Sequence, residues 1–312
     1  MGRVREVLAV LLIVAMFAVA TRMRQKEFIF PELAALVLGA WVMETPPWRC
    51  TFLSLWLSPT LAALTGTLLV RYGHVSPVLL IVAAFTLVMA QLKLMRSAIL
   101  PAISAAILPV ITRSDSWEYP CAVCLMTGVI ASGRQVMFRS GLAGYGRELA
   151  EERPVNLSGD GAAVAAVKHG GALLAGVLAV SAMAYQFHLL FMAAPPLFVA
   201  FVELARPEGG LRRRALEIVA LLVFAAFSGV LWLQLITNGL HLPVWFAACL
   251  STTSVFLLYR FMRLTFPPAV AIALLPTIIP PRSLWAYPLH VLVGSLAFVA
   301  ISTFWFGRND PA

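Results

Sequence analysis

Three features of the sequence predict an all-α, polytopic transmembrane bundle: an apolar composition, a series of apolar runs of membrane-spanning length, and a phrase that occurs twice. Of the 312 residues, 61% are hydrophobic and only 12% are charged, and the mean hydropathy is +0.90. Soluble domains carry roughly 25% charged residues, so this chain cannot cover its surface with polar groups. The apolar runs predict about twelve helices, several of them short and started by proline.

The apolar segments fall into two sets of six, separated by short links that carry basic residues, Pro or Gly. The first set covers residues 5–21, 29–44, 51–70, 77–95, 97–112 and 118–134. The second set covers residues 170–191, 194–205, 215–237, 243–262, 264–279 and 286–306.

The first segment allows two interpretations. It has a basic start, an apolar core and the sequence AVA before Thr21, which fits a cleavable signal peptide over residues 1–20. In a chain with many later spans, a retained first helix is favoured. Both alternatives place the next segment on the same side of the membrane.

A repeated phrase indicates that the two sets are copies. "LPAISAAILPVI" at 100–111 returns as "FPPAVAIALLPTI" at 266–278. Identical residues lie 167 or 168 positions apart: Met95-Arg96 and Met262-Arg263, Pro101 and Pro268, Pro109 and Pro276, and Trp117, Tyr119 and Pro120 with Trp285, Tyr287 and Pro288. Such a period predicts a tandem duplication, parallel because each copy has an even number of spans.

The expected organisation follows from that period. A first membrane repeat covers 1–134, a cytoplasmic inter-repeat loop covers 135–169, and a second membrane repeat covers 170–312. The four tryptophans and tyrosines of the repeated phrase, Trp117, Tyr119, Trp285 and Tyr287, are expected in the aromatic belts at the membrane surfaces.

The distribution of Lys and Arg predicts the orientation. The sequence "RPEGGLRRR" at 206–214 and the link 134–169 are basic, whereas the links 192–194 and 238–242 carry no Lys or Arg. Cytoplasmic loops are enriched in these residues, so we expect a bacterial inner-membrane protein with both termini in the cytoplasm. The sequence "TRMRQK" at 21–26 disagrees, because it would lie outside.

Four segments have proline in their first turn: Pro31, Pro101, Pro195-Pro196 and Pro267-Pro268. Proline is tolerated there because the N–H groups of that turn have no partner inside the helix. These segments have roughly 12 to 16 residues, fewer than the roughly 20 that cross a bilayer. We therefore expect each to start part-way into the bilayer or to cross it at a thinned, protein-lined position. A buried helix start is electropositive and attracts a small anion. Alternatively, each proline only shapes the start of an ordinary packed helix.

A substrate site is therefore expected at the starts that hold Pro31, Pro101, Pro196 and Pro268. Arg96 and Arg263 occupy matching positions before two of these helices and are candidate charge partners; alternatively they anchor the helices in lipid headgroups.

Glu32 follows Pro31 and belongs to the same candidate site. An acid at membrane depth can carry a coupling proton, but it can equally complement the helix dipole. Its counterpart in the second copy is Pro196.

No catalytic set is found: the sequence has no HExxH, no GxSxG and no paired carboxylates at helical spacing. We expect no enzyme activity and no cofactor or metal. Cys121 and Cys124 form a CxxC inside an apolar run, where they are interpreted as packing residues. The net charge of +9 is explained by helix ends at lipid headgroups, and no nucleic acid is expected as a partner.

The chain resembles the HPP family of integral membrane proteins. The sequences "FPELAALVLGAW" and "APPLFVAFVELA" are similar to an early element of that family, and "LPAISAAILPVI" and "FPPAVAIALLPTI" to its His-Pro-Pro helix. "WAYPLHVLVGSLAFVAIS" is similar to the last helix, and the resemblance covers most of 28–134 and 193–306. Leu100 and Phe266 stand where the family has histidine, and Ala102 replaces the second proline. Aromatic acid exporters of the fusaric acid resistance group are a weaker match.

Some HPP proteins are associated with nitrite movement, so the resemblance implies a permease for a small anion, nitrite-like or a small organic acid. Alternating access between the repeats is the expected mechanism. The alternatives are a structural or assembly membrane protein and an intramembrane enzyme that acts on lipids. The expected partners are membrane lipids and the solute, and small residues at Gly171, Ala175 and Ala179 also permit a homo-oligomer.

Overall fold

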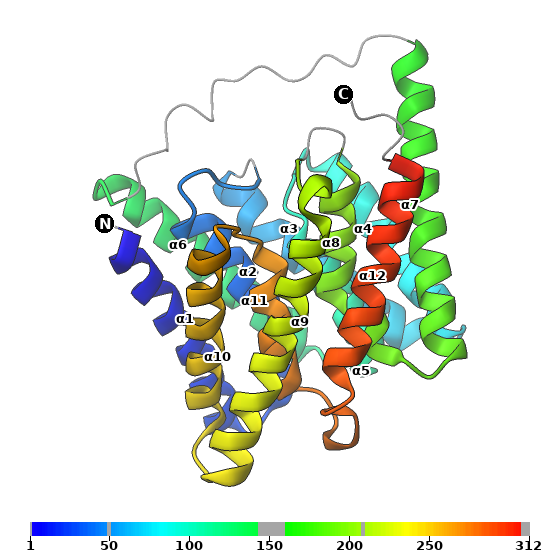
Figure 1. Cartoon of the computed structure of the whole chain (residues 1–312). Helices are drawn as coiled ribbons and strands as arrows, with labels where there is room; N and C mark the ends of the chain where they lie inside the picture. The colour runs from blue at the N-terminus through cyan, green and yellow to red at the C-terminus, as the bar shows by residue number, and fades with distance from the viewer. Residues whose placement is uncertain (1, 49–50, 143–159, 207–209, 307–312) are drawn as a thin grey trace.

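The protein is all-helical, as predicted. The computed structural model describes residues 2–48, 51–142, 160–206 and 210–306, and these contain twelve α-helices, short 3-10 and π segments, and no strand (Figure 1). Seven helical spans in the described residues are long and apolar enough to cross a membrane. The prediction of a helical membrane protein is confirmed at this level.

The helices agree closely with the predicted segments. The long helices are α1 (Gly2–Met23), α3 (Phe52–Tyr72), α4 (Pro77–Leu94), α6 (Glu118–Arg139), α7 (Asp160–Gln186), α9 (Ala215–Trp232), α10 (Val244–Met262) and α12 (Tyr287–Phe306). The short helices are α2 (Glu32–Val37), α5 (Pro101–Thr112), α8 (Pro195–Ala205) and α11 (Pro267–Leu274). The π segments Leu38–Val42 and Leu233–Gly239 continue α2 and α9.

The expected inter-repeat loop 135–169 requires a correction, because it is helical at both ends. Helix α6 continues to Arg139, and α7 already begins at Asp160. The sequence "GAAVAAVK" after Asp160 is rich in alanine, the best helix former, so it joins the helix in spite of its polar flanks. The middle of the predicted loop, 143–159, lies outside the described residues.

The four short helices form the centre of the molecule. Every residue of α2, α8 and α11 is buried, and α5 is buried from Pro101 to Val110. Helix α2 packs against α11, and α8 packs against both α5 and α11. The long helices lie around them and keep part of their surface exposed (Figure 1). These helices can be shorter than a bilayer is thick because protein surrounds them.

A proline and a tyrosine act together in each half of the chain. Pro109 has no N–H, so the carbonyl of Ala105 loses its regular donor four residues on; the Tyr119 hydroxyl donates to this oxygen at 3.0 Å. In the second half, Pro276 likewise leaves the carbonyl of Ile272 without its regular helical N–H donor. The Tyr287 hydroxyl donates to this oxygen at 2.9 Å.

These two tyrosines therefore correct a prediction. Tyr119 and Tyr287 are buried, 4% and 0% exposed, and do not lie in the interfacial belts where they were expected. Trp117 and Trp285 are exposed, 43% and 67%, as belt residues would be. The physical reason is the free carbonyl in the core, which each tyrosine satisfies.

Two glycines allow helix backbones to touch. A Cβ atom at Gly66 of α3 would lie 2.1 Å from the carbonyl oxygen of Ala106 on α5, and one at Gly229 of α9 would lie 2.1 Å from that of Ala273 on α11. Small residues at such crossings let membrane helices pack closely. Each half therefore joins a long helix to its central short helix by direct backbone contact.

The two halves are also tied together near the chain termini. The Trp48 indole N–H donates to Glu203 on α8 at 3.3 Å, and the Arg206 guanidinium donates to the carbonyl of Pro47 at 3.4 Å. Trp48 and Glu203 are both buried. These contacts join the segment before α3 to the end of α8.

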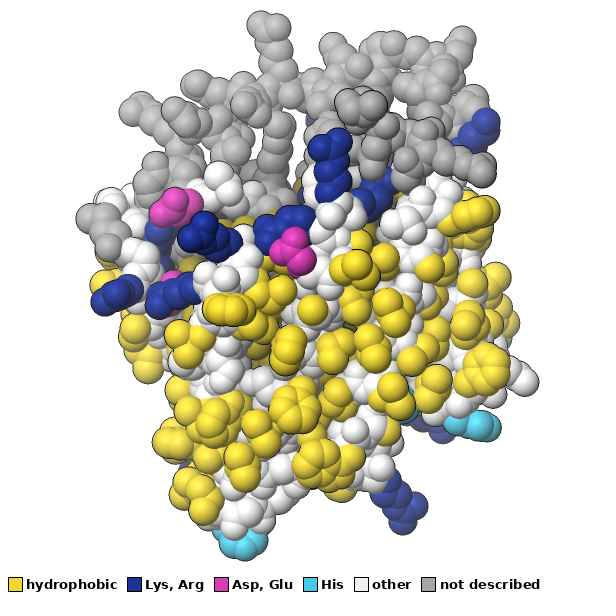
Figure 2. All heavy atoms as spheres, viewed as in Figure 1, with side chains coloured by type: hydrophobic (Ala, Val, Ile, Leu, Met, Phe, Trp, Pro, Cys, Tyr) yellow, Lys and Arg dark blue, Asp and Glu magenta, His cyan; other side chains and the backbone are white. Residues whose placement is uncertain are grey.

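Charged side chains are distributed unevenly along the molecule. Figure 2 shows a band of hydrophobic side chains across the visible face, with Lys and Arg gathered along its upper edge, the end at which α1 begins and α12 ends. Hydrophobic side chains in the middle and cations at helix ends are the pattern of a membrane-spanning bundle.

Candidate functional site

The prolines of the predicted site are all in the buried centre. Pro101, Pro196 and Pro268 are buried in the first turns of α5, α8 and α11, and Pro31 is buried directly before α2. Apolar side chains precede these starts; Phe30 and Phe266, for example, are 0% and 1% exposed. Neither of the two pockets described below is lined by any of these prolines.

Arg96 and Arg263 are not brought together with the prolines. Both are exposed, and both adopt a left-handed backbone, with φ of 50° and 49°, at the ends of α4 and α10. The carbonyl of Arg263 accepts a hydrogen bond from the Arg214 guanidinium at 3.2 Å. The left-handed residue ends each helix and directs the arginine to the surface, where it suits headgroups better than a buried anion.

Glu32, in contrast, lies inside the central group of helices. Its side chain is 1% exposed, and neither carboxyl oxygen has a hydrogen-bond partner of good geometry among the described residues. The hydroxyl of Ser104 on α5 is close to it, and Tyr119 and Tyr287 lie within range of its charge. The fold thus gathers polar groups from α2, α5, α6 and α12 around one carboxyl.

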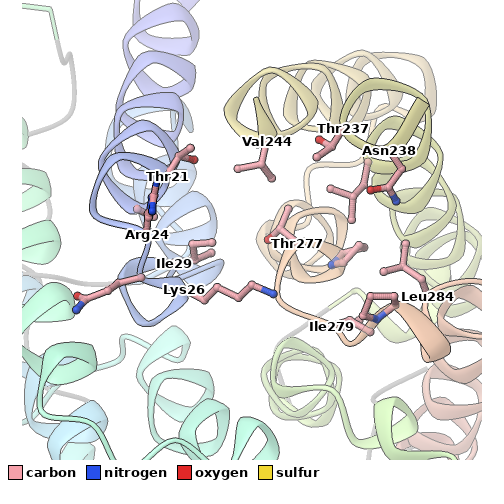
Figure 3. A pocket seen from close by; sticks show the side chains of 15 residues that line it. Thr21, Arg24, Lys26, Ile29, Thr237, Asn238, Val244, Thr277, Ile279 and Leu284 are labelled. Atoms are coloured by element: carbon pink, nitrogen blue, oxygen red, sulfur yellow. The ribbon is translucent and has the colours of Figure 1, made fainter. Parts of the chain in front are cut away.

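A pocket of about 360 Å³ (Figure 3) lies where α1 ends, opposite the side of the molecule at which α1 begins and α12 ends (Figure 1). The end of α1 and the link that follows it form one wall, from Ala20 to Ile29. The π segment after α9, the start of α10 and the link after α11 form the other walls. The polar lining consists of Thr21, Arg24, Gln25, Lys26, Thr237, Asn238 and Thr277.

The charge in this pocket is entirely positive. Arg24 and Lys26 are its only charged lining residues, and neither forms an ion pair with a described residue. In Figure 3 the Lys26 side chain extends across the pocket toward Ile279, and Thr237, Asn238 and Thr277 come from the other walls. Two cations with hydroxyl and amide groups around them are suited to bind a small anion.

The link that carries these cations is held in place. The Gln25 side chain donates to Glu118 at 2.8 Å, which fastens the link to the start of α6. Arg24 adopts a left-handed backbone with φ of 56°, which turns the chain from α1 toward α2. Thr237 adds a buried hydroxyl that has no hydrogen-bond partner among the described residues.

A smaller pocket of about 190 Å³ lies beside the first and shares Ile279 with it. It is mostly apolar, and its polar lining consists of Thr112, His188, Ser283 and His290. The His290 ring stacks near Phe191 at 6.2 Å between centroids. The segment 275–284 after α11 therefore separates two pockets that lie at the same end of the molecule.

Sequence reasoning did not select Arg24 and Lys26 as site residues. The only signal in the sequence was that both residues lie in a link predicted to face outward, whereas Lys and Arg are usually enriched in cytoplasmic links. The other walls of the pocket come from segments more than 200 residues away. No protein-family model, curated protein sequence or solved structure matches the chain.

Proposed function

We propose that this protein is a bacterial inner-membrane transporter for a small anion, nitrite-like or a small organic acid. The pocket whose charged lining is only Arg24 and Lys26 is the observation that carries the proposal. Clefts lined by one sign of charge concentrate ions of the opposite sign. A volume of about 360 Å³ falls in the range of small-molecule sites, roughly 300 to 1,000 Å³.

The proposal includes two parallel repeats, α1–α6 and α7–α12. It is supported by the recurrence, at a spacing of 167 or 168, of the Pro109–Tyr119 arrangement at Pro276–Tyr287. The backbone contact at Gly66 likewise recurs at Gly229. The resemblance to the HPP family supports a permease and rests on the same proline helices.

The proposed mechanism is alternating access. Lys and Arg gather at the end of the molecule where α1 begins and α12 ends (Figure 2), which supports a cytoplasmic position for that end. The pocket at the opposite end then faces outward. The contacts of Trp48 with Glu203 and of Arg206 with Pro47 close the inner end. An outward-open, inward-closed arrangement fits these contacts. The positive charge of Arg24 and Lys26 on the outer side then has a reason, because it attracts the substrate.

A structural or assembly protein is the alternative, and it predicts packed interfaces without a polar cavity. The pocket lined by Arg24 and Lys26 favours transport over that alternative. We also propose that a homo-oligomer is compatible with α7, because Gly171, Ala175 and Ala179 are exposed along one face of it.

The test is uptake of nitrite, nitrate, formate and acetate into proteoliposomes. We expect R24Q/K26Q to lower the uptake of the transported anion about tenfold at low substrate concentration, because two charges that attract it are lost. R22Q is the matched control: Arg22 is exposed two residues before Arg24 and does not line the pocket.

The expected result is a loss in R24Q/K26Q that becomes smaller at high salt or high substrate, with R22Q equal to the wild type. Equal uptake by all three proteins would remove the pocket from the transport route. No uptake of any anion by the wild type would contradict the proposed function.

A further inference from the structure

We propose that Glu32 is the proton-binding site of this protein and that it couples anion uptake to an inward movement of protons. The proposal rests on the proposed function, and it adds the coupling ion and the residue that binds it. It starts from the state of the Glu32 carboxyl, which is buried without a partner in the centre of the bundle.

An ionised carboxylate does not fit these surroundings. Among the described residues, only the backbone of Glu32 and the hydroxyl of Ser104 approach the two oxygens, neither in good hydrogen-bond geometry, and no Lys or Arg is among the groups that act on this carboxyl. A buried ion without a partner costs several kcal/mol, so the group is held as the neutral acid. Within the described part of the chain no group of three or more His, Cys, Asp or Glu side chains surrounds it, and a proton satisfies a lone buried carboxyl without further ligands.

The ionisable groups around Glu32 are few. Helices α5 and α11 carry no ionisable side chain, and α1, which also packs against α2, carries its ionisable groups Arg3, Arg5, Glu6 and Arg22 near its two ends. Tyr119 from α6 and Tyr287 from α12 face the carboxyl. Their hydroxyl protons are already donated to backbone carbonyls of α5 and α11. Glu32 is therefore the group in this centre that can gain or lose a proton.

The fold itself does not require an acid at this position. The matching helix start in the second half has Pro196, and α8 is buried as completely as α2. The contact of the carboxyl with the backbone of Glu32 lacks the geometry of a hydrogen bond, whereas an acid that caps a helix accepts well-aligned N–H groups. The other buried acid of the centre, Glu203, differs in this respect because Trp48 donates to it.

Glu32 is also close along the chain to the anion pocket. Ile29 lines the pocket, and Glu32 follows three residues later. Phe30 separates them: its backbone N–H donates to the sulfur of Met16 at 3.4 Å, and its ring packs against Tyr119 with centroids 6.2 Å apart. A movement of the link 24–31 that accompanies anion binding would therefore reach the carboxyl directly. One proton carried with one monovalent anion makes the transport step electrically neutral.

The experiment compares two transport modes in proteoliposomes, with nitrate and formate as probes and protein-free liposomes as background. In counterflow, a labelled anion exchanges for unlabelled anion at equal pH on both sides, which needs no net proton movement. In driven uptake, an inward pH gradient supplies the driving force. The wild type, E32Q and the control E44Q are measured in both modes; Glu44 is an exposed acid that lines neither pocket.

We expect E32Q to keep counterflow and to lose the stimulation by the pH gradient, whereas E44Q keeps both. E32Q that is still stimulated like the wild type would overturn the proton site and leave the transporter intact. No exchange by the wild type would instead contradict the proposed function.

Infrared spectroscopy gives a readout that does not depend on transport. The difference spectrum between wild type and E32Q is expected to contain the carbonyl-stretching band of a protonated carboxylic acid at neutral pH. If E32Q is inactive in both transport modes, this band still tests whether Glu32 carries a proton. Its presence supports the proposal, and its absence overturns the proposal.

Discussion

Replacing Gly66 with valine is expected to destabilise the protein by about 3 kcal/mol, because it forces apart two backbones that touch. The first atom of any side chain at this position would lie 2.1 Å from the carbonyl oxygen of Ala106, so α3 must move away from α5. The neighbour is backbone and not the end of a flexible side chain, so a small local adjustment cannot relieve the clash.

The measurement is thermal unfolding in detergent, followed by size-exclusion chromatography of the heated sample. Gly171→Val is the matched control, because a Cβ atom at Gly171 meets no atom within 4 Å. Gly229→Val should repeat the effect of Gly66→Val in the second half, where the neighbouring atom is the carbonyl oxygen of Ala273. Unfolding of Gly66→Val at the same temperature as the control would show that α3 and α5 are not in contact.

Replacing Tyr119 with phenylalanine is expected to cost about 2 kcal/mol, because it leaves the buried carbonyl of Ala105 without a donor. The hydroxyl that donates at 3.0 Å is removed, and Pro109 has no N–H to replace it. The same substitution made in a Pro109→Ala protein should cost much less, since the N–H of the new alanine can bond to Ala105 in the regular helical way.

A double-mutant cycle on Tyr119→Phe and Pro109→Ala measures this dependence directly. The unfolding transitions of the two single variants and the double variant, in the same detergent, give the coupling energy. Tyr287→Phe with Pro276→Ala forms the equivalent cycle on α11. Additive effects in the first cycle would mean that the tyrosine hydroxyl does not replace the missing N–H of the proline.

Much of the fold could be predicted because it depends on local patterns. Hydrophobic runs predicted segments 97–112 and 194–205, and the helices α5 and α8 begin at the first-turn prolines Pro101 and Pro195 within them. The start of α7 at Asp160 was not predicted: the apolar segment was expected from residue 170, because polar residues precede and follow the alanine-rich stretch after Asp160. The short length of the proline helices was predicted as well, but not that they would pack together and be shielded from lipid.

The candidate site could be predicted only in part. Glu32 was selected because an acid next to a helix start in an apolar segment is unusual, and it lies in the buried centre. Arg96 and Arg263 were selected for their matching positions in the sequence, but both are exposed and line neither pocket. Tyr119 was assigned to a belt because its aromatic type suits one, and its carbonyl partner on α5 could not be identified from that type.

Composition and period alone established an apolar helical bundle with repeated proline helices, because hydropathy and residue spacing are properties of each segment by itself. The lining of the pocket was decided only by the tertiary structure. Lys26 and Thr277 lie 251 positions apart in the chain and meet at one cavity because α1 packs against α10 and α2 packs against α11. Nothing local in either segment specifies that meeting, since it depends on how the side chains of distant helices fit together.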